Sequence, residues 1–371
     1  MPVVDIAAIQ ATVVTCTFAV CLLLGAIMQR SNFCTMGALA DIVNMGDWTR
    51  MRMWLCAIGV AIAGTQLLAW TGVVDLGKSI YTAPALTWLS YLIGGLMFGA
   101  GMVLASGCGS KTLLRIGGGS LKSVVVFCVL GVFAYMTLRG VFGVFRVGYL
   151  DPIALNLAHG QDLPRVIAGK DAGLVATARL VLGLGLGLGL VAFAFMSREF
   201  RTADSMLGGL GIGLAIVAVW AISGSLGYVA EDPNSLEEKF VGTNSGRLES
   251  LSFVAPVAYT LELLMLWSDK SRVLTLGIAA VLGLIAGSFV HALMSRQFRW
   301  EGFRGTEDTA NHLVGAALMG VGGVTAMGCT VGQGLSGVST LAIGSFMSLG
   351  AIMVGGYLAL RYQMWRVESM A

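Results

Sequence analysis

The chain has 371 residues, of which 56% are hydrophobic and 12% are charged, and its formal net charge at pH 7 is +3. A soluble protein of this length needs a more charged surface than this composition supplies, so a soluble globular fold is excluded. The small net charge and the lack of a basic run give no basis for nucleic-acid binding, which is not expected. We therefore predict an all-α polytopic membrane protein, with residues 1–371 forming one integral membrane domain.

Apolar stretches of about twenty residues, the length that crosses a bilayer as a helix, follow one another along the sequence. Those at 251–268 and 310–327 are short or interrupted by glycine, so about nine full transmembrane helices and some partial ones are expected. The positive-inside rule places the acidic segment 228–250 and the loop 151–172 outside, and the segment 197–204 inside. The predicted apolar stretches are 8–29, 53–74, 86–105, 123–145, 174–196, 206–229, 251–268, 272–294, 310–327 and 341–361.

Glycine accounts for 52 residues and forms dense clusters such as LGLGLGLGL at 182–190 and GGLGIGLA at 208–215. In lipid, small residues let helix backbones approach one another closely. We therefore expect these clusters at contacts between helices.

Two distant parts of the chain resemble each other. FGAGMVLASGC at 98–108 aligns with MGVGGVTAMGC at 319–329. The span that follows ends in YMTLR at 135–139 in the first copy and in YLALR at 357–361 in the second. Duplicated halves with broken helices at matching positions are typical of transporters, and the breaks mark the expected substrate path.

A further match lies upstream, where GAIMQR at 25–30 resembles VHALMSR at 290–296. With this match included, the sequence predicts a first repeat at about 8–145 and a second at about 272–361. The number of spans between the two copies decides whether they are inverted, and the sequence alone does not fix that number.

The cysteine and histidine spacing predicts neither a metal site nor a disulfide framework. The seven cysteines are an odd number, no CxxC or HxxxH pair occurs, and the three histidines lie far apart in the sequence. No metal, cofactor or catalytic residue is therefore expected. Four cysteines lie in apolar runs without polar neighbours and are expected to pack as small apolar residues: Cys16, Cys21, Cys56 and Cys128.

The other three cysteines lie beside breaks in the apolar runs: Cys34 in RSNFCTMGALAD, Cys108 in SGCGSKTLLR and Cys329 in MGCTVGQGLSG. Non-helical backbone at membrane depth is tolerated only where it lines a cavity or is buried in protein. These thiols are therefore the candidate residues of a substrate pathway, with Cys108 and Cys329 expected to meet near the membrane centre. If Arg30 is aligned with Arg296, Trp300 lies opposite Cys34, which then has no cysteine counterpart.

The chemistry of a thiol narrows the expected cargo, because a thiol is a weak donor with a polarizable sulfur. Sulfate is better bound by backbone N–H groups, hydroxyls and arginine. Thiosulfate has a soft terminal sulfur beside an SO₃ group, so a thiol followed by the free N–H groups of a short helix suits both of its ends. Three hypotheses remain: a permease for thiosulfate or a related sulfur anion, a membrane thiol enzyme that relays sulfane sulfur or electrons, and a transporter of another inorganic anion. The enzyme needs closely paired cysteines, which the sequence lacks, so a permease is favoured.

Charged residues near the breaks have two interpretations each. Lys111, Arg115 and Lys122 follow Cys108, where they either recruit an anion or satisfy the positive-inside rule. Glu262 lies in the apolar run VAYTLELLMLW, and a carboxylate inside a membrane is a functional candidate by default, here as a proton site. The alternative is that Glu262 lies near the membrane interface, because its run is short.

The three cysteine motifs together resemble the YeeE/YedE family of membrane proteins, and the likeness extends over nearly the whole chain. The resemblance implies an hourglass-shaped protein with short re-entrant helices entering from both faces, in the bacterial cytoplasmic (inner) membrane. It implies import of thiosulfate, passed uncleaved between Cys34, Cys108 and Cys329 by transient S–H···S contacts. Because some family members are linked to selenium or to sulfur oxidation, a selenium compound is an alternative cargo.

The resemblance also implies a partner, a small cytoplasmic sulfur carrier of the TusA type. The chain ends at Ala371, directly after its last apolar stretch. Such a carrier is therefore expected to be a separate protein. The basic stretch after Cys108 is a departure from the uncharged stretch after Cys329.

Overall fold

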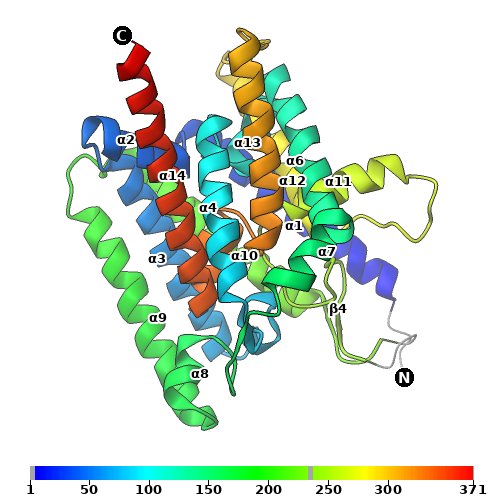
Figure 1. The fold of residues 1–371 in the computed structure, drawn as a ribbon. Coiled ribbons are helices and arrows are strands. Elements are labelled where there is room, and N and C mark those ends of the chain that lie inside the picture. The colour runs from blue at the N-terminus through cyan, green and yellow to red at the C-terminus, as the bar shows by residue number, and fades with distance from the viewer. Residues whose placement is uncertain (1–4, 233–236, 371) are drawn as a thin grey trace.

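The computed structural model describes residues 5–232 and 237–370, which form a bundle of long helices (Figure 1). Short helices interrupt the bundle, and two small two-stranded antiparallel sheets, β1 (Ala85–Leu86) with β2 (Leu155–Asn156) and β3 (Tyr228–Val229) with β4 (Lys239–Phe240), lie in its loops. The long helices are α1 (Ile6–Arg30), α3 (Thr49–Trp70), α4 (Trp88–Leu104), α6 (Leu121–Arg139), α9 (Ala172–Phe195), α10 (Ala203–Ala221), α12 (Leu276–Met294), α13 (Thr306–Thr325) and α14 (Ile343–Met370).

The short helical elements connect or break these long helices. The short α-helices are α2 (Thr35–Met45), α5 (Gly109–Gly117), α7 (Val141–Phe145), α8 (Leu163–Ala168) and α11 (Ala255–Met265). The remaining turns are the 3₁₀ helices η1 (Leu76–Lys78) and η2 (Ile80–Thr82) and the π-helical turns η3 (Arg146–Leu150), η4 (Ile222–Leu226) and η5 (Gly332–Gly337).

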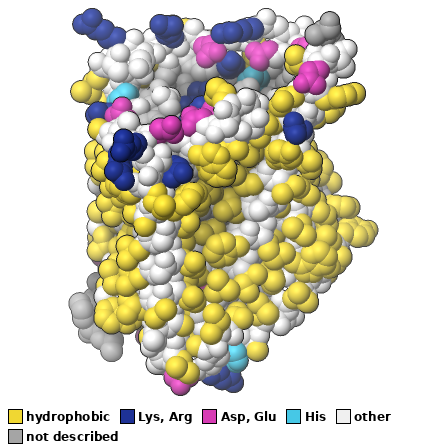
Figure 2. Space-filling view, turned by 90° about the vertical axis from the view of Figure 1, so that its left-hand side faces the viewer, with side chains coloured by type: hydrophobic (Ala, Val, Ile, Leu, Met, Phe, Trp, Pro, Cys, Tyr) yellow, Lys and Arg dark blue, Asp and Glu magenta, His cyan; other side chains and the backbone are white. Residues whose placement is uncertain are grey.

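The prediction of an all-α polytopic membrane protein is confirmed. Within the described residues, eight helical segments are long and apolar enough to cross a membrane. α13 is a further helix of 20 residues, which carries Glu307 and Asp308 in its first turn and packs between α4 and α6. Figure 2 shows a broad apolar belt with charged side chains gathered above and below it.

The two polar ends of the bundle carry different segments. Arg30 pairs with Asp204 at 2.8 Å and Arg366 pairs with Glu307 at 2.8 Å, so the segments 196–202 and 295–305 lie with the end of α14. We call this the C-terminal end. The described residues of 228–250, which are 228–232 and 237–250, lie at the opposite end, because α10 and η4 connect them to the segment before Ala203. The predicted separation of 197–204 from 228–250 is therefore present.

Glycines show how the helices are directed relative to one another. α4 and α13 are antiparallel: a Cβ added at Gly94 would lie 2.7 Å from the Gly322 carbonyl oxygen, and one added at Gly101 would lie 2.7 Å from the Gly315 carbonyl oxygen. Such contacts require glycine, because any side chain would meet the facing backbone. The sequence match between 98–108 and 319–329 therefore relates two antiparallel helices, which pack directly against each other.

The upstream match has a different geometry. α1 and α12 are parallel, since Gly25 faces Ser288 near one end and Gln10 donates to the Leu274 carbonyl at 2.9 Å near the other. The operation that relates two repeats either reverses the direction of every helix along the membrane normal or keeps it. It therefore cannot relate α4 to the antiparallel α13 and also α1 to the parallel α12. The alignment of Arg30 with Arg296 is therefore wrong.

Candidate functional site

The three predicted pathway cysteines each lie at the start of a short helical element. α1 ends at Arg30, Asn32 takes a positive φ of 51°, and Cys34 is the N-cap residue of α2. The Cys34 Sγ accepts a hydrogen bond from the Gly37 backbone N–H at 3.3 Å. The thiol thus occupies the position in which serine or aspartate usually caps a helix.

Cys108 and Cys329 lie in breaks with the same backbone pattern. Ser106 after α4 and Met327 after α13 have φ values of 55° and 57°, and in each case a glycine and then the cysteine follow. The Cys108 Sγ lies 3.3 Å from the Ser110 Oγ at the start of α5. The predicted helix breaks are therefore present, and they turn both thiols out of the helices that precede them.

The Cys329 Sγ also faces the start of a helical element. It accepts a hydrogen bond from the Gly332 backbone N–H at 3.4 Å, at the first residue of η5. A glycine at position 328, with a φ of 159°, precedes it. Cys329 is thereby held in the same way as Cys34, by an N–H group three residues ahead.

The three cysteines are buried and lie close together. The Cys34 thiol lies next to the Cys108 thiol, and the hydroxyl of Thr330, the residue after Cys329, also lies next to Cys108. The exposed fraction is 7% for Cys34, 1% for Cys108 and 0% for Cys329. The structure thus brings all three predicted pathway residues into one place, although their sequence positions are far apart.

A fourth short helix, α11, begins at the same place. A Cβ added at Gly109 would lie 2.8 Å from the Phe253 carbonyl oxygen, and the Ser336 hydroxyl donates to the Leu251 carbonyl at 2.7 Å. The N-cap residue of α11 is Val254, which is buried and carries no polar group. The start of α11 was not predicted at the site, because it contains no cysteine and its apolar run resembles a short span.

The helix starts give the site a positive potential. The first N–H groups of an α-helix lack partners within the helix, and the helix dipole adds about half a positive charge there. α2, α5 and α11, with 11, 9 and 11 residues, all begin around the thiols. The site is therefore suited to an anion that also presents a polarizable atom.

The three basic residues after Cys108 have different surroundings. Lys111 packs beside Gly107 and lies near both the Cys34 and Cys108 thiols. Arg115 lies one turn further along α5 and also approaches Gly107. Lys122 forms an ion pair with Glu301 at 2.8 Å at the C-terminal end, so its charge is already balanced.

A chamber opens from the opposite end of the bundle towards Cys329. It has a volume of about 240 Å³, and its lining includes Ser252 and Gly328. Gly328 directly precedes Cys329, and Ser252 packs against Gly332, whose N–H bonds the Cys329 sulfur. A second chamber of about 190 Å³ adjoins it, since Asn244 and Tyr259 line both.

The environment of Glu262 is ionic. Its carboxylate accepts a hydrogen bond from the Tyr135 hydroxyl at 2.9 Å and pairs with Arg272 at 3.1 Å. The side chain is buried and lines the second chamber. Glu262 thus has a cationic partner in the structure, which a reading of its apolar run alone did not indicate.

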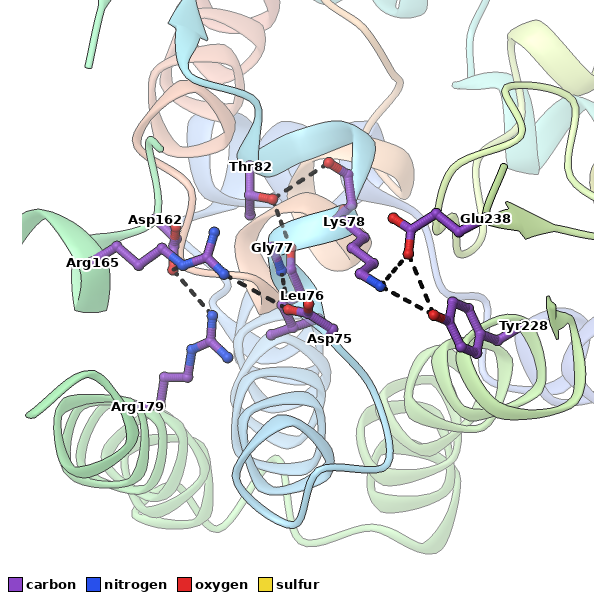
Figure 3. A network of polar contacts seen from close by, with 11 residues as sticks. Asp75, Leu76, Gly77, Lys78, Thr82, Asp162, Arg165, Arg179, Tyr228 and Glu238 are labelled. Atoms are coloured by element: carbon purple, nitrogen blue, oxygen red, sulfur yellow. Dashed lines mark hydrogen bonds and ion pairs between the residues drawn. The ribbon is translucent and has the colours of Figure 1, made fainter. Parts of the chain in front are cut away.

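A separate ionic network fastens the loops at the end opposite the C-terminal end. Figure 3 shows Arg165 between Asp75 and Asp162, at 3.7 and 3.9 Å, with Arg179 directed at Asp162 at 3.5 Å. In the same view Lys78 reaches Glu238 at 2.5 Å. This network joins η1 to α8, α9 and the 237–240 segment and does not include the thiols.

Three of the four cysteines expected to be packed contact the core, and the fourth does not. Cys21 and Cys56 are buried, Cys16 is half-buried against the core, and Cys128 is exposed on the apolar surface of α6. Within residues 5–232 and 237–370, no cluster of three or more His, Cys, Asp or Glu side chains is placed to hold a metal ion.

Comparisons with known proteins identify the family of the chain. A family model described as sulphur transport matches residues 30–358. A thiosulfate transporter TsuA of Escherichia coli (strain K12) is 27% identical over 330 residues, which are 84% of each chain. A thiosulfate transporter TsuA of Spirochaeta thermophila is 25% identical over 339 residues, which are 90% of this chain and 94% of the relative. Both relatives are named transporters, in agreement with the prediction that the chain is not an enzyme, and the chain belongs to the sulphur transport family.

Proposed function

We propose that the protein is a permease that imports thiosulfate through a pathway lined by Cys329, Cys108 and Cys34. The observation that carries the proposal is the meeting of three buried thiols with the N-termini of three short helices. Support comes from the two similar proteins, which are named thiosulfate transporters.

The two ends of thiosulfate match the two kinds of group at the site. Its SO₃ end accepts hydrogen bonds from the free N–H groups at the starts of α2 and α5, as anions do at helix N-termini. Its terminal sulfur is soft and makes S–H···S contacts with the thiols, which are weak donors. These contacts are weak, so the anion passes from one thiol to the next without a bond being cleaved. Sulfate has no soft end and is expected to be carried poorly.

The direction of the path follows from the charge distribution. Lys and Arg residues are more frequent at the C-terminal end than at the opposite end. The positive-inside rule therefore assigns the C-terminal end to the cytoplasmic side of the bacterial inner membrane. Thiosulfate then enters by the chambers beside Gly328, meets Cys329 first, and leaves past Cys34 and Lys111. The basic residues of the C-terminal end are Arg30, Arg50, Arg52, Arg115, Lys122, Arg198, Arg201, Arg296, Arg299, Arg304, Arg361 and Arg366.

The three thiols are distributed unequally over the two copies of an inverted repeat. We infer that α1 to α6 and α10 to α14 are its two copies, because α4 and α13 are antiparallel and each is followed by a cysteine break. α2 then corresponds to α11, Phe33 to Phe253 and Cys34 to Val254. The cytoplasmic half of the path keeps a thiol where the outer half has an apolar side chain.

Import of thiosulfate is uphill in a cell whose interior is negative. Each elementary charge moved against the potential costs about 2.3 kcal/mol per 100 mV, so a dianion costs about twice that amount. A cytoplasmic carrier of the TusA type that takes thiosulfate from the C-terminal end would favour net entry by removing the product. Such a carrier is the expected partner at the basic C-terminal end.

Uptake by proteoliposomes that contain the purified protein tests the proposal. Thiosulfate labelled separately at its outer and inner sulfur is expected to enter with both labels at equal rates. The variants C34A, C108A and C329A should lose uptake, while C16A and C128A, which change a half-buried and an exposed thiol away from the site, should keep it. Entry of the outer sulfur alone would instead indicate a sulfur-relay enzyme, and equal effects of all five variants would show that the three thiols are not special.

A further inference from the structure

Among the described residues, the lining of the outer chamber beside Gly328 includes one acidic side chain, that of Glu249. The segment that carries it lies between β4 and α11, outside the spanning helices. The carboxylate accepts a hydrogen bond from the Ser245 backbone N–H at 3.0 Å, and the backbone N–H of Glu249 donates to the Ser223 hydroxyl at 3.4 Å. Glu249 is thus fixed in the wall of the route that leads to Cys329.

The other ionisable groups around the chamber do not neutralise Glu249. The phenols of Tyr81 in η2 and Tyr259 in α11 face it, and both are uncharged at neutral pH. Arg146 in η3 is the basic residue of the chamber lining, and it is paired with Asp151 at 3.2 Å. Among the described residues, no lysine or arginine forms an ion pair with Glu249, in contrast to Glu262.

This arrangement makes the charge of the chamber depend on one proton. With Arg146 balanced by Asp151, an ionised Glu249 gives the chamber a net negative charge, and a protonated Glu249 gives it none. Burial raises the pKa of Glu249 above its ordinary value of 4.5, and the hydrogen bonds from Ser245 and Asn244 only partly oppose this. A dianion is repelled by the ionised form and admitted by the neutral form.

We propose that Glu249 is an external proton site that controls the affinity of the outer chamber for thiosulfate. The inference rests on the proposed function, since the anion is thiosulfate only if that function holds. Proton binding and anion binding then favour each other, because each lowers the electrostatic cost of the other, and linkage makes the effect reciprocal. Thiosulfate remains a dianion between about pH 5 and pH 8, so a group that titrates in this range belongs to the protein.

The sign of the pH dependence follows from the charge of Glu249. Below its pKa the side chain is neutral and the KM for thiosulfate is low, and above its pKa the side chain is ionised and the KM is high. The expected change in KM is about tenfold, which corresponds to a pKa shift of one unit on anion binding. The effect is on KM, because Glu249 acts at the entrance and does not touch the thiols.

The experiment measures thiosulfate uptake by proteoliposomes with the external pH varied between about 5 and 8 and the internal pH held constant. Wild type should show a KM that rises with pH, E249Q should show a low KM at every pH, and E249D should restore the dependence. E238Q is the matched control, because Glu238 is an acidic residue at the same end that pairs with Lys78 outside both chambers (Figure 3).

Each outcome separates the two proposals. Three outcomes would overturn the role of Glu249 and leave the proposed function intact. These are a wild-type KM for thiosulfate that is independent of pH, an E249Q variant that keeps the wild-type pH dependence, and an E238Q variant that loses it. A wild type without thiosulfate uptake at any pH would overturn the proposed function and this role with it. If E249Q is poorly folded by its Tm, the pH dependence of E249D decides, since an acid at this position must keep it.

Discussion

The contact between α4 and α13 predicts a specific effect of adding one methyl group. A Cβ at Gly322 would lie 2.6 Å from the Gly94 carbonyl oxygen and 2.6 Å from the Phe98 nitrogen. Both are backbone atoms, so no side chain can turn away, and ordinary contact at about 3.4 Å requires the helices to separate by about 0.8 Å. Overpacking of this kind costs about 1–3 kcal/mol. The substitution G322A should therefore lower the Tm of the purified protein.

The same separation should affect transport. Cys108 follows α4 by four residues and Cys329 follows α13 by four residues, so a shift of one helix moves one thiol turn relative to the other. G322A should reduce thiosulfate uptake even at temperatures well below its Tm. The assay is the initial rate of uptake by proteoliposomes with equal amounts of folded protein.

A matched control uses the same substitution where nothing is in contact. A Cβ at Gly350 in α14 meets no atom within 4 Å, and that residue is exposed on the apolar surface. Since alanine has a higher helix propensity than glycine, by about 1 kcal/mol, G350A should keep or raise the Tm. Equal Tm values and equal uptake for G322A and G350A would refute the argument that the α4–α13 contact positions the thiols.

Two further predictions concern ion pairs at the C-terminal end. The hydrogen bond from Lys122 holds the pKa of Glu301 below its ordinary value of 4.5, so the pair stabilises the protein above that pH, and this effect is lost as the pH falls through the lowered pKa. E301Q should therefore have a lower Tm than wild type at pH 7, and the difference in Tm should vanish in acid. A Tm difference that does not change with pH would contradict this. Asp41 in α2 is buried and accepts hydrogen bonds from Arg50 on both carboxylate oxygens. D41N should therefore lower the free energy of unfolding by about 1–3 kcal/mol, and it should lower uptake by displacing Cys34. A D41N variant with the wild-type Tm would show that this ion pair does not hold α2 in place.

The sequence predicted the thiol turns because local signals marked them. Cys108 and Cys329 each follow an apolar run and a glycine, in segments that match over eleven residues, and the structure has a break at both. The same holds for Cys34, where Arg30 ends the apolar run and α2 begins after the cysteine. Glycine-rich contacts between helices are also present, for example between Gly94 and Gly322.

Other parts of the site needed the structure because their signals are not local. The segments around the starts of α2 and α11 share little beyond Phe33 and Phe253, which precede the two helices. The clearer sequence match was therefore the one between the ends of α1 and α12, although these helices are parallel. Glu249 lies in a polar loop like many exposed carboxylates, and only the packing around it shows the chamber. Lys122 lies near Lys111 in the sequence, but its charge is balanced by Glu301, a residue far along the chain.

The packing of α4 has a consequence for biosynthesis. Its most extensive partners, α13 and α14, leave the ribosome only after α12, and α1 and α3 likewise pack against α12 and α10, which are made later than they are. The glycine-lined face of α4 therefore stays without its final partners in the membrane until α13 and α14 have been inserted. Neither half of the chain encloses its own interior, so the order of insertion and the order of packing are separated in time.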